Sequence, residues 1–418
     1  MLKVWTDGSE AGLLEHNGGR AGERGTTFAY LPEAAAGRAV SVTMPVRLAS
    51  WDTRFGLAPI FEMNLPEGAL RERLRLAFAK ATGSFDELDL LAIVGRSQMG
   101  RVRVTGREER LDEDVPFQSV AEILSQRRDG TLFQYLIEKF ATSSGISGVQ
   151  PKFLLRDAEA FGGGDSVSRE FAQSYRGATH IVKFWENLQF PQLAANEFFC
   201  LTVARRCGLE VPRFQLSEDG RALVVERFDL RADGAGYQSR YLGFEDFCVL
   251  NARRAADKYN GSYETAILKR LDQFAISPSM QEDRMRLFTL IALNCALRNG
   301  DAHLKNFGIL YDDVEGEARL APVYDVVTTT VYLPKDGMAL TLNGSTRWAS
   351  AKELKRLGET RAGATPAEVR GALDKIAEAM AGTLVELQDY MRGHAEFREV
   401  GERMIVEWEA GLAHSLQG

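Results

Sequence analysis

The sequence lacks any hydrophobic run that approaches the roughly 20 residues needed to span a membrane. Its first residues, Met1-Leu-Lys-Val-Trp-Thr-Asp-Gly, alternate like a β-strand and lack the apolar segment of a signal peptide. It has only four cysteines, and none of them forms a C-x-x-C pair. These absences argue against a membrane protein, a disulfide scaffold and a zinc site. They favour a cytoplasmic protein with buried free thiols.

The chain is long and slightly acidic. Its 418 residues exceed what one small core accommodates, so two or three domains or lobes are expected. Hydrophobic residues make up 45% and the net charge is -7, as in a soluble globular protein. The negative charge argues against a chain that itself grips nucleic acid broadly, although a local basic patch stays possible.

Three parts follow from the pattern of apolar residues, with boundaries at 1–107, 117–228 and 229–418. The first part should hold strands at Ala39–Met44 and Val102–Val104 and a helix at Phe85–Val94 that Gly95 ends. The highly charged stretch Thr105–Pro116 is typical of an exposed linker.

The second part is rich in strands and the third in helices, an α+β pattern that resembles the two lobes of a kinase. The strands are expected at Lys152–Leu155, His180–Phe184 and Ala222–Glu226, around a helix at Glu197–Cys207. The later helices are expected at Phe244–Leu250, Arg284–Arg298, Pro366–Ala381 and Leu384–Tyr390.

A loop rich in small residues precedes the first of these strands and reads Ser143-Ser-Gly-Ile-Ser-Gly-Val-Gln-Pro-Lys152. Glycines let backbone N–H groups approach phosphate oxygens, and the hydroxyls add donors. The loop is not a Walker A motif, since no Gly-Lys-Ser/Thr opens a helix. It is either a phosphate-binding loop or a plain surface turn.

Lys183 lies in an apolar strand, where a lysine needs a partner or a ligand. It either contacts nucleotide phosphates, as the strand lysine of protein kinases does, or points to solvent. Glu197, early in the following helix, either pairs with Lys183 or is exposed near the positive end of the helix dipole.

The strongest candidates for chemistry are Asp301, Asn306 and Asp325. The apolar stretch Arg284–Arg298 predicts a buried helix that carries Asp301 on a loop at its end; Asn306 follows five positions on, and Asp325 follows a further strand. Each residue alone could be an ordinary turn residue. Together they match the phosphoryl-transfer set, in which the first Asp accepts the proton of the acceptor hydroxyl and the other two bind the metal.

Neighbouring residues have open alternatives. His303 either hydrogen-bonds Asp301 or phosphate, or caps loop carbonyls; Lys305 either neutralises the phosphoryl group or is solvated. The segment Val225–Asp229 is either a hinge that binds adenine or a strand with one exposed ion pair.

With these residues in place, the chain resembles the HipA family of serine/threonine toxin kinases over nearly its full length. The resemblance depends on the order and spacing of seven motifs. They are Phe61-Glu-Met-Asn-Leu-Pro-Glu-Gly68, Ser147-Gly-Val-Gln-Pro-Lys152, Asn196-Glu-Phe-Phe-Cys200, Glu226-Arg-Phe-Asp229, Phe244-Glu-Asp-Phe-Cys248, Gly300-Asp-Ala-His-Leu-Lys-Asn306 and Ala321-Pro-Val-Tyr-Asp325.

The resemblance implies an N-terminal α/β subdomain on a kinase core, with ATP and Mg²⁺ as cofactors. It makes Asp301 the general base and Asn306 and Asp325 the metal ligands, and we retain His303 and Lys305 as further candidates for the catalytic set. The implied nucleotide-binding residues are Ser147, Gly148, Val149, Gln150, Lys152, Lys183, Glu226, Phe228 and Tyr324. It further implies a helix-turn-helix antitoxin that contacts operator DNA, an aminoacyl-tRNA synthetase as substrate and autophosphorylation of the loop.

One position departs from the family. The family loop often reads Ser-aliphatic-Ser, whereas this chain reads Gly145-Ile146-Ser147. Ser147 is therefore the first candidate for autophosphorylation, with Ser144 or Ser143 behind it, and regulation through the first serine is in doubt.

The sequence therefore predicts an ATP-dependent protein serine kinase that acts as a toxin. Two rival hypotheses stay open. One is a small-molecule or lipid kinase of the same fold, although no membrane-docking run is present. The other is an inactive scaffold that binds the antitoxin on DNA, against which the intact Asp301, Asn306 and Asp325 argue.

Overall fold

The computed structural model forms two compact units. One comprises Met1–Phe184, Val224–Ala255 and Leu310–Glu317, and the other comprises Trp185–Leu223, Ala256–Ile309 and Ala318–Gly418. The three-part division predicted from the sequence stays a prediction. The structure describes residues 1–18, 24–82, 85–125, 131–148, 150, 152–157, 176–185, 190–232, 239–275 and 279–417.

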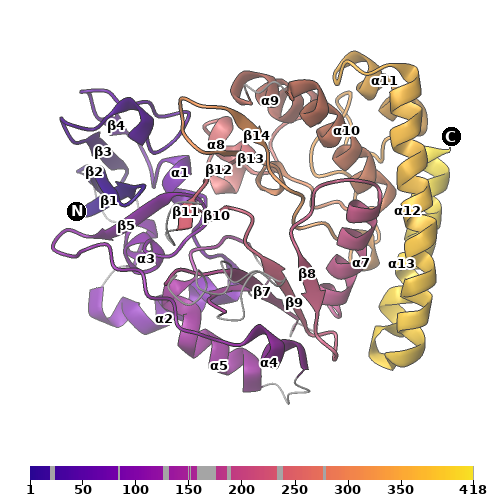
Figure 1. Cartoon of the computed structure of the whole chain (residues 1–418), viewed down its shortest axis with the longest axis horizontal. Coiled ribbons are helices and arrows are strands. Elements are labelled where there is room, and N and C mark those ends of the chain that lie inside the picture. The colour runs from indigo at the N-terminus through magenta and orange to yellow at the C-terminus, as the bar shows by residue number, and fades with distance from the viewer. Residues whose placement is uncertain are drawn as a thin grey trace. The chain divides into compact units, whose positions relative to one another are not determined.

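The first unit begins with a five-stranded sheet in the order β4-β3-β2-β1-β5, in which each described strand pair is antiparallel (Figure 1). Asp7 and Gly8, both at positive φ, make the two-residue turn between β1 and β2, which matches the twist of a hairpin. The strands are β1 (Leu2–Thr6), β2 (Ser9–His16), β3 (Thr26–Tyr30), β4 (Trp51–Asp52) and β5 (Val102–Gly106).

Short helices connect the strands of this unit. The predicted helix over Phe85–Val94 is confirmed as α3 (Glu87–Val94), because the side chain of Asp86 accepts the N–H groups of Leu88 and Asp89 and Gly95 is its C-cap. The other helices are α1 (Pro59–Glu62), α2 (Gly68–Thr82), α4 (Val120–Ser125) and α5 (Thr131–Phe140).

The strand predicted at Ala39–Met44 is wrong. A 3₁₀ turn, Ala36–Arg38, precedes this segment, which forms only an isolated bridge between Ser41 and Met44. Its polar groups turn instead to one buried carboxylate: the Oγ of Ser41 and the N–H of Val42 donate to Glu245 at 2.6 and 2.8 Å. The carboxylate of Glu245 therefore accepts hydrogen bonds that would otherwise go to a neighbouring strand.

The predicted strands of the second part are confirmed. β6 (Lys152–Leu155) pairs antiparallel with β7 (His180–Phe184), and β7 lies between β6 and β9 (Ala222–Glu226) in the sheet. A short hairpin of β10 (Leu230–Ala232) and β11 (Ser239–Tyr241) follows.

The helix predicted at Phe244–Leu250 is only half correct. The chain forms β12 (Gly243–Asp246) and then α8 (Phe247–Leu250). Asp246 is extended, and its carboxylate accepts the N–H of Val249 at 3.0 Å, so the helix begins only after this cap. The stretch Thr105–Pro116 is likewise only partly the exposed linker that its charges predict, since Val115 is buried.

The second unit is mainly helical. α12 packs on α7, and α10, α11 and α13 also contact α12; Figure 1 shows α12 and α13 running side by side. The elements of this unit are α7 (Leu193–Arg206), β8 (Phe214–Leu216), α9 (Lys269–Phe274), α10 (Met280–Ala296), β14 (Ala318–Leu320), α11 (Ala351–Thr360), α12 (Pro366–Gly393) and α13 (Arg398–Gly411). The chain passes between the units within β9 and again within β13 (Gly308–Tyr311).

Two predictions for this unit need adjustment. α12 is one continuous helix where two were expected, because Gly382 does not interrupt it. α7 starts at Leu193, four residues before the predicted Glu197. All four cysteines are free and buried, as predicted. Among the described residues, no helix is both long and apolar enough to cross a membrane.

Candidate active site

The loop of the predicted proton acceptor begins where α10 ends. Asn294, in the last turn of this buried helix, accepts the N–H of Asn299 with its carbonyl (2.9 Å) and the side-chain amide of Asn299 with its Oδ1 (2.7 Å). Asn299 in turn accepts the N–H of Asp301 at 3.1 Å. Two asparagines therefore fix the backbone on which Asp301 stands.

Position 300 requires a glycine because neighbouring atoms lie too close for any side chain. Its N–H donates to the Oγ1 of Thr329 at 2.7 Å. A Cβ at this position would lie 2.1 Å from the Oδ2 of Asp336 and 2.6 Å from the carbonyl oxygen of Gly337. Any side chain here would push the loop away from Asp336, so the glycine before Asp301 holds the loop in place.

The Asp301 side chain is half exposed, so a substrate hydroxyl can reach it. The phenol of Tyr259 donates to its Oδ1 at 2.6 Å, and the Nε2 of His303 lies 3.9 Å from the same oxygen. The surrounding protein raises the pKa of Asp301, mainly by desolvation and also through the negative charges of Asp325 and Asp336. The Tyr259 hydrogen bond opposes this shift.

His303 is buried and neutral. Burial lowers its pKa to about 3, and the charges of Lys258 and Lys305 add to the effect. Its Nε2 is too far from Asp301 for a hydrogen bond. Its backbone supports the turn Leu304–Asn306: its N–H donates to the Oδ1 of Asn306 (3.3 Å) and its carbonyl accepts the N–H of Asn306 (3.0 Å). The imidazole Nδ1 is buried and has no hydrogen-bond partner among the described residues, so both alternatives for this side chain stay predictions.

The segment that carries Asp325 contacts the same loop through Tyr324, whose hydroxyl donates to the carbonyl oxygen of Lys305 at 3.0 Å. Asp325 follows at a φ of +53°, a conformation that only a few non-glycine residues adopt. Three residues on, the backbone of Thr328 exchanges two hydrogen bonds with the side chain of Asn196, at 2.9 and 3.1 Å. The segment that carries Asp325 is thereby tied to α7.

The donor types at this loop suit magnesium. Asn306 and Asp325 offer amide and carboxylate oxygens, which Mg²⁺ prefers, and Mg²⁺ takes its remaining ligands from water and phosphates. The negative charges of Asp325 and Asp336 both raise the pKa of Asp301, and a divalent cation bound at this loop would oppose that effect. No group of three or more His, Cys, Asp or Glu that could hold a metal occurs among the described residues.

The small-residue loop of the first unit packs against the segment Ser97–Met99. The N–H of Gly145 donates to the carbonyl of Ser97 at 2.8 Å, and the N–H of Met99 donates back to Gly145 at 3.3 Å. A Cβ at Gly145 would lie 2.5 Å from the Cβ of Gln98 and 2.7 Å from the oxygen of Ser97. The glycine that departs from the family pattern therefore stands where this fold has no room for a side chain.

The loop serines differ in access. Ser144 is fully buried; its Oγ donates to the carbonyl of Phe140 at 2.8 Å and accepts the N–H of Leu154 at 3.0 Å. Ser147 is partly exposed, and its Oγ donates to Glu67 at 2.6 Å. Gln150 donates to the carbonyl of Phe184 at 3.4 Å, and Val149 lies outside the described residues.

Two lysines stand opposite each other where this loop enters the sheet. Lys152 of β6 and Lys183 of β7 are direct cross-strand partners, so their side chains lie on the same face, and both are buried. A Cβ on Gly148, at a φ of +129°, would lie 2.4 Å from the Nζ of Lys152. The solvent-facing alternative for Lys183 is therefore wrong, and this arrangement concentrates positive charge beside a glycine backbone. Glu197 is buried too, so its exposed alternative is also wrong.

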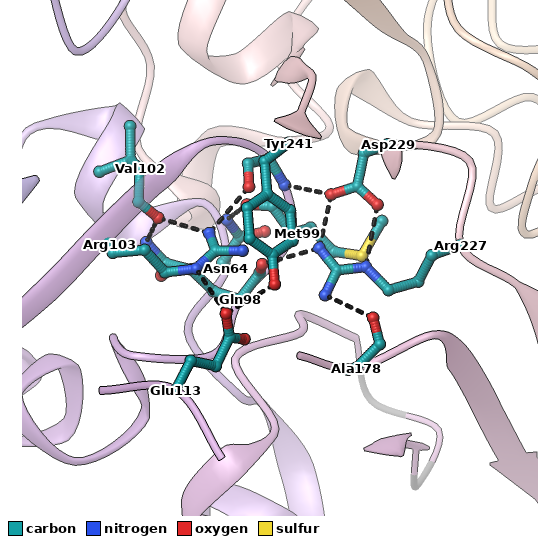
Figure 2. Close-up of polar contacts among 11 residues, drawn as sticks. Asn64, Gln98, Met99, Val102, Arg103, Glu113, Ala178, Arg227, Asp229 and Tyr241 are labelled. Atoms are coloured by element: carbon teal, nitrogen blue, oxygen red, sulfur yellow. Dashed lines mark hydrogen bonds and ion pairs between the residues drawn. The ribbon is translucent and has the colours of Figure 1, made fainter. Parts of the chain in front are cut away.

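The predicted hinge contains an ion pair, but the pair is buried rather than exposed. Arg227 and Asp229 meet in a bidentate contact from which solvent is fully excluded, and in the sequence they alternate with the predicted adenine-binding residues Glu226 and Phe228. Figure 2 shows the carboxylate of Asp229 facing the guanidinium of Arg227. Asp229 also accepts the N–H of Gly100 at 2.6 Å. Phe228 packs edge-on against Phe244, with ring centroids 5.3 Å apart.

More buried charge surrounds this pair. In Figure 2 the ring of Tyr241 lies between two guanidinium groups, 3.7 Å from that of Arg103 and 5.2 Å from that of Arg227. The Tyr241 hydroxyl donates to Glu113 at 2.6 Å. Residues from the first 113 positions therefore complete the surroundings of the hinge, and Glu113 explains why the charged stretch around it is not simply an exposed linker.

Three residues that contact Asp301 or shift its pKa were not predicted from the sequence. Lys258, Tyr259 and Asp336 belong to no recognisable motif, and their spacing from Asp301 follows no helix or strand period. The one sequence feature that could have drawn attention to them is the adjacent pair Lys258-Tyr259.

Two domain patterns of one family match the chain. The HipA N-terminal domain matches residues 2–105, and the HipA-like C-terminal domain matches residues 144–384, which is more than half of the chain. The chain belongs to the HipA family. This confirms the resemblance that the motifs indicated.

Named relatives agree with this assignment. "Putative kinase Y4dM" of Sinorhizobium fredii is 28% identical over 308 residues, 70% of this chain and 67% of that protein. "Putative kinase Y4mE" of the same organism is 28% identical over 342 residues, 79% of this chain and 78% of that protein. The solved complex of HipA, HipB and operator DNA from Shewanella oneidensis MR-1 contains a chain with a TM-score of 0.65 and 18% identity, covering 99% of this chain and 98% of that one. This confirms the predicted α+β, HipA-like fold.

Proposed function

We propose that this chain is an ATP-dependent protein serine/threonine kinase that acts as the growth-inhibiting toxin of a toxin–antitoxin pair. The observation that carries the proposal is the half-exposed carboxylate of Asp301 on a loop fixed by asparagines, with Asn306 and Asp325 following at the expected spacing. Membership of the HipA family and the kinase names of its relatives support it.

The proposed site residues have two roles, binding of the nucleotide and transfer of its γ-phosphoryl group. Lys152, Lys183 and the backbone around Gly148 hold phosphate oxygens, while Glu226 and Phe228 hold the adenine. Asp301 accepts the proton of the acceptor hydroxyl as its oxygen attacks the γ-phosphorus and the bond to ADP breaks. Asn306 and Asp325 hold Mg²⁺, which neutralises phosphate charge when bound. Neutral His303 supports the loop, and Lys305 lies next to the metal-binding Asn306.

Autophosphorylation belongs to the same proposal, and the two candidate serines are not equivalent. Ser144 uses its hydroxyl as donor and acceptor inside the protein, whereas Ser147 is partly exposed and makes one contact, to Glu67. A phosphate on Ser147 would put two negative charges beside that carboxylate and break the contact. We therefore expect Ser147 to carry the phosphate.

The proposed partners follow those of the relative from Shewanella oneidensis, which was solved with HipB and operator DNA. We propose that a HipB-like helix-turn-helix antitoxin binds this chain and supplies most of the DNA contact, since the net charge of -7 disfavours broad DNA binding by the chain itself. An aminoacyl-tRNA synthetase is the proposed protein substrate, and the cytoplasm is the proposed compartment.

The deciding experiment compares wild type with Asp301→Asn after incubation with ATP and Mg²⁺. Mass spectrometry reads phosphate on Ser147 and on added aminoacyl-tRNA synthetases, and calorimetry reads ATP binding. The proposal expects transfer by the wild type alone and ATP binding by both proteins. ATP binding without transfer to any protein would favour the small-molecule or scaffold alternatives, and absence of ATP binding would rule out a kinase.

A further inference from the structure

Tyr259 makes a contact that the proposed reaction does not require. Its phenolic hydroxyl donates to the Oδ1 of Asp301 at 2.6 Å, and its ring stands edge-on to His303, with centroids 5.0 Å apart at an angle of 78°. Tyr259 is 48% exposed, and the Asp301 side chain is 50% exposed. The hydrogen bond therefore lies at a surface that an acceptor can reach.

A nearby tyrosine, Tyr263 at the start of the helical turn Tyr263–Leu268, shows what a structural role looks like. Tyr263 is 2% exposed, and its hydroxyl donates to the backbone carbonyl of Ala302 at 3.0 Å. It satisfies the buried carbonyl oxygen of Ala302, and buried polar groups in folded proteins need such a hydrogen-bond partner. Tyr259, in contrast, places its hydroxyl on a carboxylate that water could satisfy equally well, so the bond adds little to stability.

The loop that carries Tyr259 is held without this side chain. The carbonyl of Lys258 accepts the N–H of Leu304 at 3.1 Å. The backbone N–H and the side-chain amide of Asn260 both bond to Asp257, at 2.9 and 3.0 Å. Because these contacts fix the backbone on either side, the phenol can leave Asp301 by rotation about its own side-chain bonds.

The hydroxyl of Tyr259 stands in the relation to Asp301 that an acceptor hydroxyl must adopt. A general base takes a proton from a donor about 2.6–3.2 Å away. The phenol is such a donor, and the ordinary pKa of a phenol, about 10, lies far above that of a carboxylic acid, so it keeps its proton while it is hydrogen-bonded to the Asp301 carboxylate.

We propose that Tyr259 caps the base: without a protein acceptor its hydroxyl occupies Asp301 and keeps water from being activated there, and an arriving acceptor displaces it. The residue thus favours transfer to protein over hydrolysis of ATP. This inference rests on the proposed kinase function, because it needs Asp301 to act as the base.

The test uses the full chain with ATP and Mg²⁺ and no protein acceptor, and it measures the release of inorganic phosphate. Tyr259→Phe keeps the ring on His303 and removes only the hydroxyl. We expect kcat for hydrolysis to rise at least about threefold while KM for ATP stays within about twofold. Tyr263→Phe is the control: it removes a phenol that donates to the carbonyl oxygen of Ala302, next to Asp301, and leaves the hydrogen bond from Tyr259 to Asp301 in place.

A second variant shows that the gain passes through the base. Asp301→Asn combined with Tyr259→Phe should hydrolyse no faster than Asp301→Asn alone. An equal or lower kcat in Tyr259→Phe would overturn the cap and make Tyr259 a residue that merely orients Asp301. Phosphate found on Tyr259 itself would overturn it too, since the phenol would then be an acceptor.

Failure of the cap and failure of the kinase give different results. If the wild type binds ATP and phosphorylates Ser147 but Tyr259→Phe does not change phosphate release, only the cap is wrong. If the wild type neither binds ATP nor transfers phosphate, the kinase proposal fails and the cap with it.

Discussion

Asp229 holds Arg227 in a two-bond ion pair at the predicted hinge, with Nε to Oδ1 at 2.9 Å and Nη2 to Oδ2 at 2.6 Å. Both side chains are wholly buried. The same guanidinium donates to the carbonyl of Gln98 at 3.0 Å, and the same carboxylate accepts the N–H of Gly100. The pair therefore joins the hinge to residues from the HipA N-terminal domain pattern, which ends at 105.

Asp229→Ala should destabilise the protein strongly, because it leaves a buried guanidinium without its counter-charge. Breaking a buried pair of this kind costs about 3–5 kcal/mol of unfolding free energy. Asp272→Ala is the control: it removes the partner of Arg284 from a partly exposed ion pair, and such pairs contribute about 0–1 kcal/mol. Urea denaturation followed by circular dichroism measures both. Equal losses of unfolding free energy in the two variants would contradict the prediction that the buried Arg227–Asp229 pair matters more to stability than the exposed one.

The motifs could be predicted from the sequence because each is local. The strands that carry Lys152 and Lys183 and the helix before Asp301 follow from apolar patterns over a few residues. The contact of Tyr259 with Asp301 spans 42 positions, and that of Ser41 with Glu245 spans 204. No local sequence pattern predicts contacts between residues that lie so far apart in the chain. The contact of Ser41 with Glu245 is also the reason why the strand predicted at Ala39–Met44 does not form.

Gly145→Ser restores the family serine and should be costly. The new Cβ would stand 2.5 Å from the Cβ of Gln98 and 2.7 Å from the oxygen of Ser97, so the loop or its neighbour must move. Overpacking of this kind costs about 1–3 kcal/mol. Gly371→Ser, in α12 with no atom within 4 Å of its Cβ position, should be neutral or slightly stabilising.

Thermal midpoints of the two glycine variants test this directly. We expect a clear fall for Gly145→Ser and none for Gly371→Ser. A Gly145→Ser protein as stable as the wild type, with phosphate on the new serine, would show that the loop opens easily. It would then return the first loop position to the list of regulatory sites.

His180 should make stability depend on acid pH. Burial lowers its pKa from 6.5 to about 4, and the nearby charge of Asp157 only partly opposes this shift. Between these values the unfolded chain binds a proton that the folded chain does not, so the stabilisation is complete above about pH 6.5 and is lost as the pH falls toward 4. The loss is on the order of 3 kcal/mol at its end.

The measurement is the unfolding free energy of the wild type and His180→Gln between pH 7 and pH 5. The difference between the two proteins isolates this group from the carboxylates that titrate in the same range. The wild type should lose more stability than the variant, whereas His414→Gln, at an exposed position, should follow the wild type. Parallel curves for wild type and His180→Gln would refute the prediction.

Asn196 should support the proposed Mg²⁺ site without binding the metal itself, because its side chain holds the backbone of Thr328, three residues after Asp325. Asn196→Ala leaves two buried backbone groups of Thr328 without partners and lets the Asp325 segment shift. Loss of such supporting contacts typically weakens metal binding by about 10–100-fold. The Mg²⁺ concentration for half-maximal transfer to Ser147 should rise accordingly. Thr383→Val, which removes a buried hydroxyl in α12, controls for lost stability alone. If both variants keep the wild-type Mg²⁺ requirement, Asn196 serves folding only, and Asp325 is held by other contacts.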